Sequence, residues 1–251
     1  MCVARSDGSD TRCATGAAGP DVLGGIVVSG PSWSPDGETI AFSAFIYSCP
    51  DGQCGQFGGY WTPLMLLHAS TMQVDTLPTP AGVVSASWSP DGRKIALVIF
   101  GPAAMGSGGL AVVNGDGTGY QVLAESFGSY SMNDVAWSPD GATFALRLTD
   151  QNACPWYCDT AIGVVNVDAT NLRILDKARN TDQQYFWTRP EWSPDGRHLA
   201  YTITSGGDCY LHHLGCNDLA VVEVSSARVS RLLANGAYPS WRPGVAGSIR
   251  R

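Results

Sequence analysis

A five-residue sequence, Trp-Ser-Pro-Asp-Gly, recurs four times along this chain of 251 residues. The copies occupy Trp33–Gly37, Trp88–Gly92, Trp137–Gly141 and Trp192–Gly196, and a degenerate fifth copy begins at Trp241. Successive tryptophans are 55, 49, 55 and 49 residues apart. These intervals are close to the length of propeller blades, about 40–50 residues. The repeat therefore predicts an all-β chain that folds as a β-propeller.

Each copy of the motif lies between two apolar runs, such as residues 83–88 and 94–99 around the second copy. Proline sets the φ required at the first central position of a turn, aspartate suits the next position, and glycine accepts a positive φ. The motif is therefore expected to form a tight hairpin turn, with its tryptophan in the gap between neighbouring blades. The motif aspartates are interpreted as turn residues: Asp36, Asp91, Asp140 and Asp195.

The two ends of the chain are predicted to share one blade. Few residues follow Trp241, whereas residues 1–15 resemble the third and fourth strands of the second repeat. We expect a single domain, residues 1–251, with five blades of four antiparallel strands. Four blades are continuous, at approximately 17–80, 81–126, 127–178 and 179–235, and the fifth combines 236–251 with 1–16. Closure within one chain is favoured because its effective concentration is high, and exchange of the half-blades between chains is the alternative.

The eight cysteines form four local pairs: Cys2 with Cys13, Cys49 with Cys54, Cys154 with Cys158, and Cys209 with Cys216. A zinc site would want a Cys-x-x-Cys knuckle, and the sequence contains none. We therefore expect disulfides and no metal, although sequence alone does not fix the connectivity. Cys2 and Cys13 are expected to face each other across a hairpin. Disulfides indicate an oxidising compartment, so an extracellular or periplasmic location is expected.

The composition excludes several kinds of partner. The formal net charge is −7 and the 15 basic residues are scattered. Phosphate binding needs clustered Lys and Arg, so no nucleic acid partner is expected. No stretch approaches the roughly 18 consecutive apolar residues of a membrane span. Residues 1–10 lack the apolar core of a signal peptide, and we expect the secretion signal to lie outside this sequence.

The motif and its flanking residues resemble the repeat of the TolB-like propellers. The resemblance rests on Ser-Trp-Ser-Pro-Asp-Gly followed by an Ile-Ala-Phe or Ile-Ala-Leu strand, at residues 40–42 and 95–97, and it covers nearly the whole chain. No Trp-Asp dipeptide of the WD-type repeat occurs. The six blades and the additional α/β domain of TolB are not evident here, so its partners are not carried over. Peptidase and polysaccharide-lyase propellers are also similar, and the resemblance implies a fold rather than a function.

Candidate binding residues lie in loops that join the second and third strands of three blades. A cysteine pair brackets each loop, and a loop held in one shape has a lower ordering cost on binding. The contact residues predicted in two of these loops are Trp156, Tyr157, Tyr210, His212 and His213. The alternative is that these rings fold back over the ends of the sheets. Adjacent histidines with no third ligand in view are weak evidence for a metal site.

The sequence contains no Gly-x-Ser-x-Gly elbow, no His-Glu-x-x-His sequence and no phosphate loop. We therefore favour a secreted, disulfide-stabilised propeller that acts as a protein-interaction or scaffold module and self-associates through its split blade or loop face. No catalytic residue, metal or cofactor is expected. The alternative is a carbohydrate-binding or carbohydrate-active propeller, because a glycan site assembled at the channel mouth from separate blades would leave no local motif.

Overall fold

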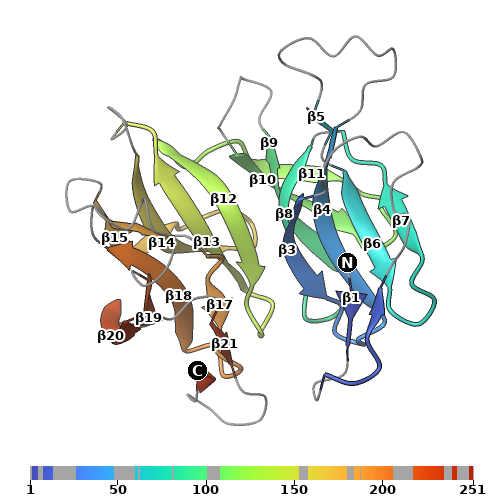
Figure 1. Ribbon diagram of the computed structural model, residues 1–251. Helices are drawn as coiled ribbons and strands as arrows, with labels where there is room; N and C mark the ends of the chain where they lie inside the picture. The colour runs from blue at the N-terminus through green and yellow to red at the C-terminus, as the bar shows by residue number, and fades with distance from the viewer. Residues whose placement is uncertain are drawn as a thin grey trace.

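The computed structural model describes residues 2–4, 8–13, 27–47, 60–61, 63–80, 82–100, 108–152, 158–179, 184–186, 188–205, 217–234, 239–241 and 249–250. Within these ranges the chain forms strands and turns and no helix. Four complete sheets follow one another in chain order around a common axis (Figure 1). The all-β propeller predicted from the repeat is therefore confirmed.

Each complete blade is an antiparallel sheet of consecutive strands. The first blade consists of β3 (Val27–Trp33), β4 (Thr39–Tyr47), β6 (Leu64–His68) and β7 (Val74–Leu77), with β5 (Tyr60–Trp61) paired to β4. The second blade consists of β8 (Val83–Trp88), β9 (Lys94–Phe100), β10 (Gly108–Asn114) and β11 (Gln121–Ala124). The third blade consists of β12 (Tyr130–Trp137), β13 (Thr143–Asp150), β14 (Asp159–Asn166) and β15 (Arg173–Ala178).

The fourth blade has an interrupted first strand. It consists of β16 (Gln184–Phe186), β17 (Glu191–Trp192), β18 (His198–Ser205), β19 (Asn217–Glu223) and β20 (Arg228–Ala234). Both β16 and β17 pair with β18, and Arg189 lies in the segment between them. The first strands β3, β8, β12 and β17 contact one another in chain order, so they form the innermost layer around the axis.

The Trp-Ser-Pro-Asp-Gly motif forms the turn between the first and second strands of every complete blade. In the first blade the Gly37 N–H donates to the Ser34 carbonyl oxygen at 2.9 Å, and Gly37 has a φ of 73°. The Ser34 hydroxyl donates to Asp36 Oδ1 at 2.5 Å, and the same oxygen accepts the Glu38 N–H. Equivalent bonds form in the other three motifs. The interpretation of the motif aspartates as turn residues is confirmed.

Three of the four core clusters lie between successive complete blades, and a motif tryptophan contributes to each of these three. Trp88 packs between the first and second blades with Ala41, Leu64, Leu66, Ile95 and Leu97. Trp137 packs between the second and third blades, and its ring centroid lies 4.8 Å from that of Phe144. Trp192 packs against the cluster shared by the third and fourth blades. Large aromatic rings at these interfaces bury much apolar area, which holds neighbouring blades together.

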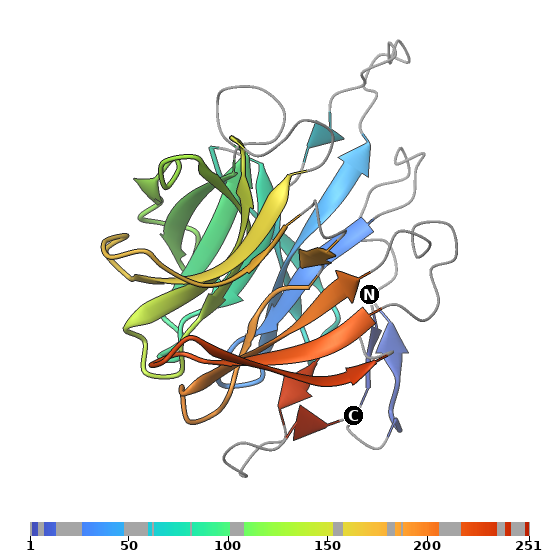
Figure 2. The same cartoon turned by 90° about the vertical axis from the view of Figure 1, so that its left-hand side faces the viewer.

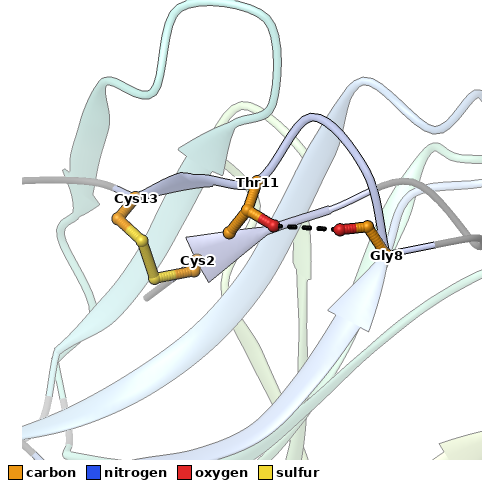
Figure 3. The surroundings of a disulfide bond; sticks show 4 residues. All are labelled: Cys2, Gly8, Thr11 and Cys13. Carbon is orange, nitrogen blue, oxygen red and sulfur yellow. Dashed lines mark hydrogen bonds between the residues drawn. A yellow bond between two sulfur atoms is a disulfide. The ribbon is translucent and has the colours of Figure 1, made fainter.

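The N-terminal residues form a hairpin of β1 (Cys2–Val3) and β2 (Arg12–Cys13), the pair of blue strands near the N label in Figure 2. Cys2 faces Cys13 in the strand register, and a disulfide joins them as predicted. Figure 3 shows this disulfide and the hydrogen bond at the turn, in which the Thr11 hydroxyl donates to the Gly8 carbonyl oxygen at 3.3 Å. The hairpin is therefore closed at both ends.

The apolar face of this hairpin packs on the first blade as a preceding blade would. Val3 lies against a buried cluster of the first blade, formed by Ile40, Phe42, Met65 and Leu67. Val164 of the third blade packs with the residues at the same positions of the fourth blade, which are Leu199, Tyr201, Ala220 and Val222. Val3 therefore occupies, against the first blade, the position that Val164 of the third blade occupies against the fourth blade.

A polar contact repeats in the same way. Arg12 Nη1 donates to the Ser70 carbonyl oxygen at 3.2 Å. Arg173 begins the outer strand of the third blade and its Nη1 donates to the Ser225 carbonyl oxygen of the fourth blade at 3.3 Å. Ser70 and Ser225 hold the same position in the turn between the third and fourth strands of their blades. The N-terminal hairpin thus makes the inter-blade contacts of an outer half-blade.

The C-terminal residues form a second two-stranded sheet of β21 (Ser240–Trp241) and β22 (Ile249–Arg250). Trp241 Nε1 donates to the Glu191 carbonyl oxygen at 2.9 Å, as Trp192 Nε1 donates to the Ala136 carbonyl oxygen at 3.1 Å. This contact places β21 beside β17. Among the strands described, β22 pairs with β21 and β1 pairs with β2. The described residues therefore form four complete blades and two separate two-stranded sheets, whereas the sequence predicted five complete blades.

Candidate functional site at the channel mouth

A cavity of about 280 Å³ lies where the inner strands end at their motif turns. Its walls come from all four complete blades and comprise Trp33, Trp88, Trp137 and Trp192, three motif prolines, several serines, Ala136, Arg189 and Glu191. The cavity is therefore the motif-side mouth of the propeller channel. Its size is near the lower limit for small-molecule sites, about 300 Å³.

Arg189 crosses this mouth from the fourth blade to the first two. Its Nε and Nη2 donate to Glu191 Oε1 at 3.1 and 2.9 Å, and its Nη1 donates to the Ala86 carbonyl oxygen at 3.2 Å. Its Nη2 also reaches the Pro31 carbonyl oxygen at 3.5 Å. An innermost strand has no sheet partner on the channel side, so its inward carbonyls need donors from elsewhere. Arg189 supplies them and ties three blades together.

Glu191 carries the more accessible charge of this pair. Its side chain is 37% exposed, against 19% for that of Arg189. The bonds from Arg189 use Oε1 alone, so Oε2 retains lone pairs for the donor of a ligand. The pair as a whole is neutral, and the polar group that it offers at the mouth is a hydrogen-bond acceptor.

Serine hydroxyls join the inner strands of the first three blades. Ser32 Oγ accepts the Trp88 backbone N–H at 3.1 Å, and Ser87 Oγ accepts the Trp137 backbone N–H at 2.9 Å. The serine that precedes one motif tryptophan therefore accepts the backbone N–H of the motif tryptophan in the next blade. This N–H points toward the channel, where its own sheet offers no acceptor. These serine hydroxyls hold the ring together at the wall of the cavity.

Four carboxylates stand at the turns around the mouth: Asp36, Asp91, Asp140 and Asp195. In each, the hydrogen bond from the motif serine, followed by that from a backbone N–H, lowers the pKa below its usual value. All four are therefore ionised at neutral pH. Their Oδ1 atoms are engaged within the turns, so these residues hold the turn shape and give this face a fixed negative charge.

Trp33 is the most exposed of the four tryptophans that line the mouth. It is 49% exposed, whereas Trp88 at the same motif position is 9% exposed. The difference follows from their neighbours, because the first blade covers Trp88, whereas none of the four complete blades precedes the first blade and covers Trp33. The mouth therefore presents one large aromatic surface to solvent.

The loop residues predicted as contacts lie outside the described residues: Trp156, Tyr157, Tyr210, His212 and His213. Five of the predicted disulfide cysteines also lie there: Cys49, Cys54, Cys154, Cys209 and Cys216. Cys158 is described and is disulfide-bonded. In the described part of the chain, no three His, Cys, Asp or Glu side chains converge as a metal site requires. That part also contains no helix long and apolar enough to cross a membrane.

From the sequence, the candidate site is expected on the loops opposite the motif, and Arg189 and Glu191 are not predicted. A signal for Glu191 exists in the repeat. The residue before the motif tryptophan is Ser32, Ser87 or Ala136 in the first three blades, and only the fourth blade has a charged residue there. A charged residue at a position that is otherwise occupied by a small residue indicates that this position has a different role in the fourth blade.

No family model matches the chain. Among solved structures it is similar to TolB from Acinetobacter baumannii, with a TM-score of 0.62 and 16% identity over 96% of this chain and 51% of that chain. An oligogalacturonate lyase in complex with manganese gives a TM-score of 0.56 and 16% identity over 85% of this chain and 55% of that one. A putative TolB from Agrobacterium tumefaciens gives 0.55 and 16%, over 83% and 81%.

This chain spans about half the length of the first two structures that it matches. Identities of this size show the fold alone. The resemblance to TolB-like propellers that the motif predicted is therefore confirmed as a likeness of fold, and function must be argued from the site.

Proposed function

We propose that this protein is a recognition module that binds a partner protein at the motif-side mouth of its channel. The observation that supports this function is the 49% exposed indole of Trp33 on the rim of the cavity. Tryptophan is enriched among the residues that dominate binding energy at protein interfaces. Trp33 belongs to an inner strand paired with β4, so little conformational entropy is lost when a partner covers it.

The chemistry of the mouth favours binding over catalysis. Arg189 is engaged by Glu191 and by backbone carbonyls, and Ser32 and Ser87 join neighbouring strands. Groups held in this way position walls rather than react. The loop residues named from the sequence are a second proposed contact surface, on the opposite face of the propeller.

We also propose an extracellular or periplasmic location. Cys2 and Cys13 are both exposed and are oxidised to a disulfide, and Cys158 is disulfide-bonded. Exposed disulfides persist in oxidising compartments and are rare where thiols are kept reduced. The similarity in fold to TolB-like propellers, a group with periplasmic members, agrees with this proposal.

Photo-cross-linking from position 33 tests the binding function. The photoreactive residue p-benzoylphenylalanine replaces Trp33 in one variant and Val122, which is 43% exposed on the outer strand of the second blade, in a control variant. We expect a discrete cross-linked product from position 33 and none from position 122 in cells that make the protein. Equal products from both positions, or none from either, would contradict a partner site at the mouth.

Carbohydrate binding is the second candidate function. An exposed indole beside a carboxylate acceptor suits a sugar, whose apolar face stacks on the ring while its hydroxyls donate to Glu191 Oε2. Neighbours in fold include an oligogalacturonate lyase. An array of oligosaccharides that includes oligogalacturonates, probed with wild type and Trp33→Ala, tests this function. Binding that disappears in the variant supports it, and the absence of any binding by wild type opposes it.

The complete ring is proposed to have five blades in one domain. The fifth blade would combine β21 and β22 as its inner half with β1 and β2 as its outer half. In support, the outer half makes the same contacts with the first blade that the third blade makes with the fourth, and Trp241 repeats the bond of Trp192. Because both halves dock on blades of their own chain, closure within one molecule is favoured over exchange between molecules.

A further inference from the structure

We infer that the motif-side mouth recognises an arginine side chain of the partner protein, which stacks on Trp33 and donates hydrogen bonds to Glu191 Oε2. The inference rests on the binding function proposed above and adds the chemistry that the partner must present. Arginine is the side chain that combines a permanent positive charge with a planar fork of N–H donors. Tryptophan and arginine are also the residues most enriched where binding energy concentrates at protein interfaces.

The hydrogen-bonding groups of the mouth call for a donor from the partner. Each of the three guanidinium nitrogens of Arg189 donates to an acceptor of the protein itself, namely Glu191 Oε1 or the carbonyl oxygens of Ala86 and Pro31. These bonds leave the lone pairs of Glu191 Oε2 for a ligand. A carboxylate oxygen accepts most strongly from a charged donor. The partner group that suits this position is therefore a cation with N–H donors.

One side chain can contact Trp33 and Glu191 together. Arg189 Nη2 lies 2.9 Å from Glu191 Oε1 and 3.5 Å from the Pro31 carbonyl oxygen. Pro31 is two positions before Trp33, and both Trp33 and Glu191 line the cavity. The Trp33 residue is 49% exposed and the Glu191 side chain is 37% exposed. A guanidinium stacks on an indole face while it donates in its own plane, so a single arginine satisfies both groups.

The size of the cavity limits what can enter it. Its volume of about 280 Å³ is near the lower limit for small-molecule sites. The motif turns around it touch one another, because the proline of one turn lies beside the glycine of the next, as Pro35 lies beside Gly92 and Pro90 beside Gly141. Turns in contact hold the width of the mouth. The group that enters is therefore one projecting side chain rather than a helix or a strand.

The charge around the mouth also favours a cation. Five acidic and two basic residues occupy the four motif turns and the positions that directly follow them: Asp36, Glu38, Asp91, Asp140 and Asp195 against Arg93 and Arg197. The motif aspartates are ionised at neutral pH, since the serine hydrogen bonds lower their pKa. Arg189 is neutralised by Glu191. The excess of negative charge attracts a basic partner and repels an acidic one.

Fluorine NMR of protein labelled with fluorotryptophan tests this recognition with two short peptides. One probe is an acetylated Gly-Arg-Gly amide, and the other carries citrulline, which has the shape of arginine but no charge, in place of the arginine. The Trp33 resonance is assigned by its loss in Trp33→Phe. We expect the arginine peptide to shift this resonance saturably, and the citrulline peptide to bind about tenfold more weakly or worse, because its donor is uncharged. This comparison uses the wild type alone, so it does not depend on the folding of a variant.

A matched pair of variants tests the role of Glu191. Glu191→Gln keeps an oxygen for Arg189 but removes the charge, so the affinity for the arginine peptide should fall about tenfold. Glu125→Gln removes the same charge from an exposed position after β11 and should leave the affinity unchanged. Equal losses in both variants would contradict a role for Glu191 in the recognition.

The inference and the proposed binding function fail in different ways. Equal shifts from both peptides, or no shift from the arginine peptide at millimolar concentration, would overturn arginine recognition. A discrete cross-linked product from position 33 in that case would leave the binding function standing. A shift specific to the arginine peptide with no cross-linked product from position 33 would support the arginine site and remove the partner protein from the proposed function.

Discussion

Replacing Arg189 with methionine is expected to lower the free energy of unfolding by about 2–4 kcal/mol. Methionine keeps an unbranched side chain but donates no hydrogen bond. Ala86 is fully buried, and its carbonyl oxygen loses the Nη1 donor at 3.2 Å. A buried acceptor left unpaired costs about 1–3 kcal/mol. The ion pair with Glu191 is partly exposed and adds about 1 kcal/mol or less.

Urea unfolding followed by circular dichroism measures this loss. Arg197→Met is the control, because Arg197 is an exposed arginine beside the motif turn of the same blade, and surface changes of this kind stay within about 0.5 kcal/mol. Arg189→Lys should fall between them, since lysine keeps the charge but lacks the planar fork that reaches several acceptors. If Arg189→Met loses no more stability than the control, Arg189 does not hold the blades together.

Four further outcomes are expected. Tyr201→Phe should destabilise the protein by about 1–3 kcal/mol in urea unfolding, because it removes the 2.6 Å bond from the buried hydroxyl to Asp176 Oδ2. Burial raises the pKa of Asp176. The stability that the protonated carboxyl contributes is therefore present at low pH and is lost as pH rises through that raised pKa. Asp176→Asn should flatten this part of the curve of unfolding free energy against pH. Replacing Cys2 and Cys13 together by serine should destabilise the N-terminal hairpin by on the order of 2–3 kcal/mol, measured as faster proteolysis there. The hydrogen bonds from the motif serines lower the pKa of the four motif aspartates. The stability that the turns contribute should therefore be lost only as pH falls through these lowered pKa values. In acid unfolding, the wild type should unfold at a lower pH than the motif Ser→Ala variants.

The fold could be predicted from sequence because its key interactions are local. The bonds between Ser34, Asp36 and Glu38 join residues that are at most a few positions apart, so a pentapeptide carries the whole turn. The facing of Cys2 and Cys13 follows from the same local logic, since a hairpin turn fixes the register of the strands that it joins. Because the motif is repeated, the same local prediction applies to every blade that contains it.

The channel mouth could not be predicted in this way because its contacts are long-range. Arg189 reaches Ala86 and Pro31, which are 103 and 158 positions away. No periodicity records such a contact, and an arginine in an interrupted strand has no special signature. Five complete blades were predicted, whereas the described residues form four. The pairing of two-residue strands such as β1 and β22 depends on the rest of the ring, so the local motif does not determine it.

The residue before each motif tryptophan decides how the next blade is attached. Where it is serine, the hydroxyl accepts the next tryptophan's backbone N–H, and the Trp137 indole then bonds within its own turn, to the Gly141 carbonyl oxygen at 3.1 Å. Ala136 has no hydroxyl and Glu191 binds Arg189, so the next indole reaches back to their backbone carbonyls.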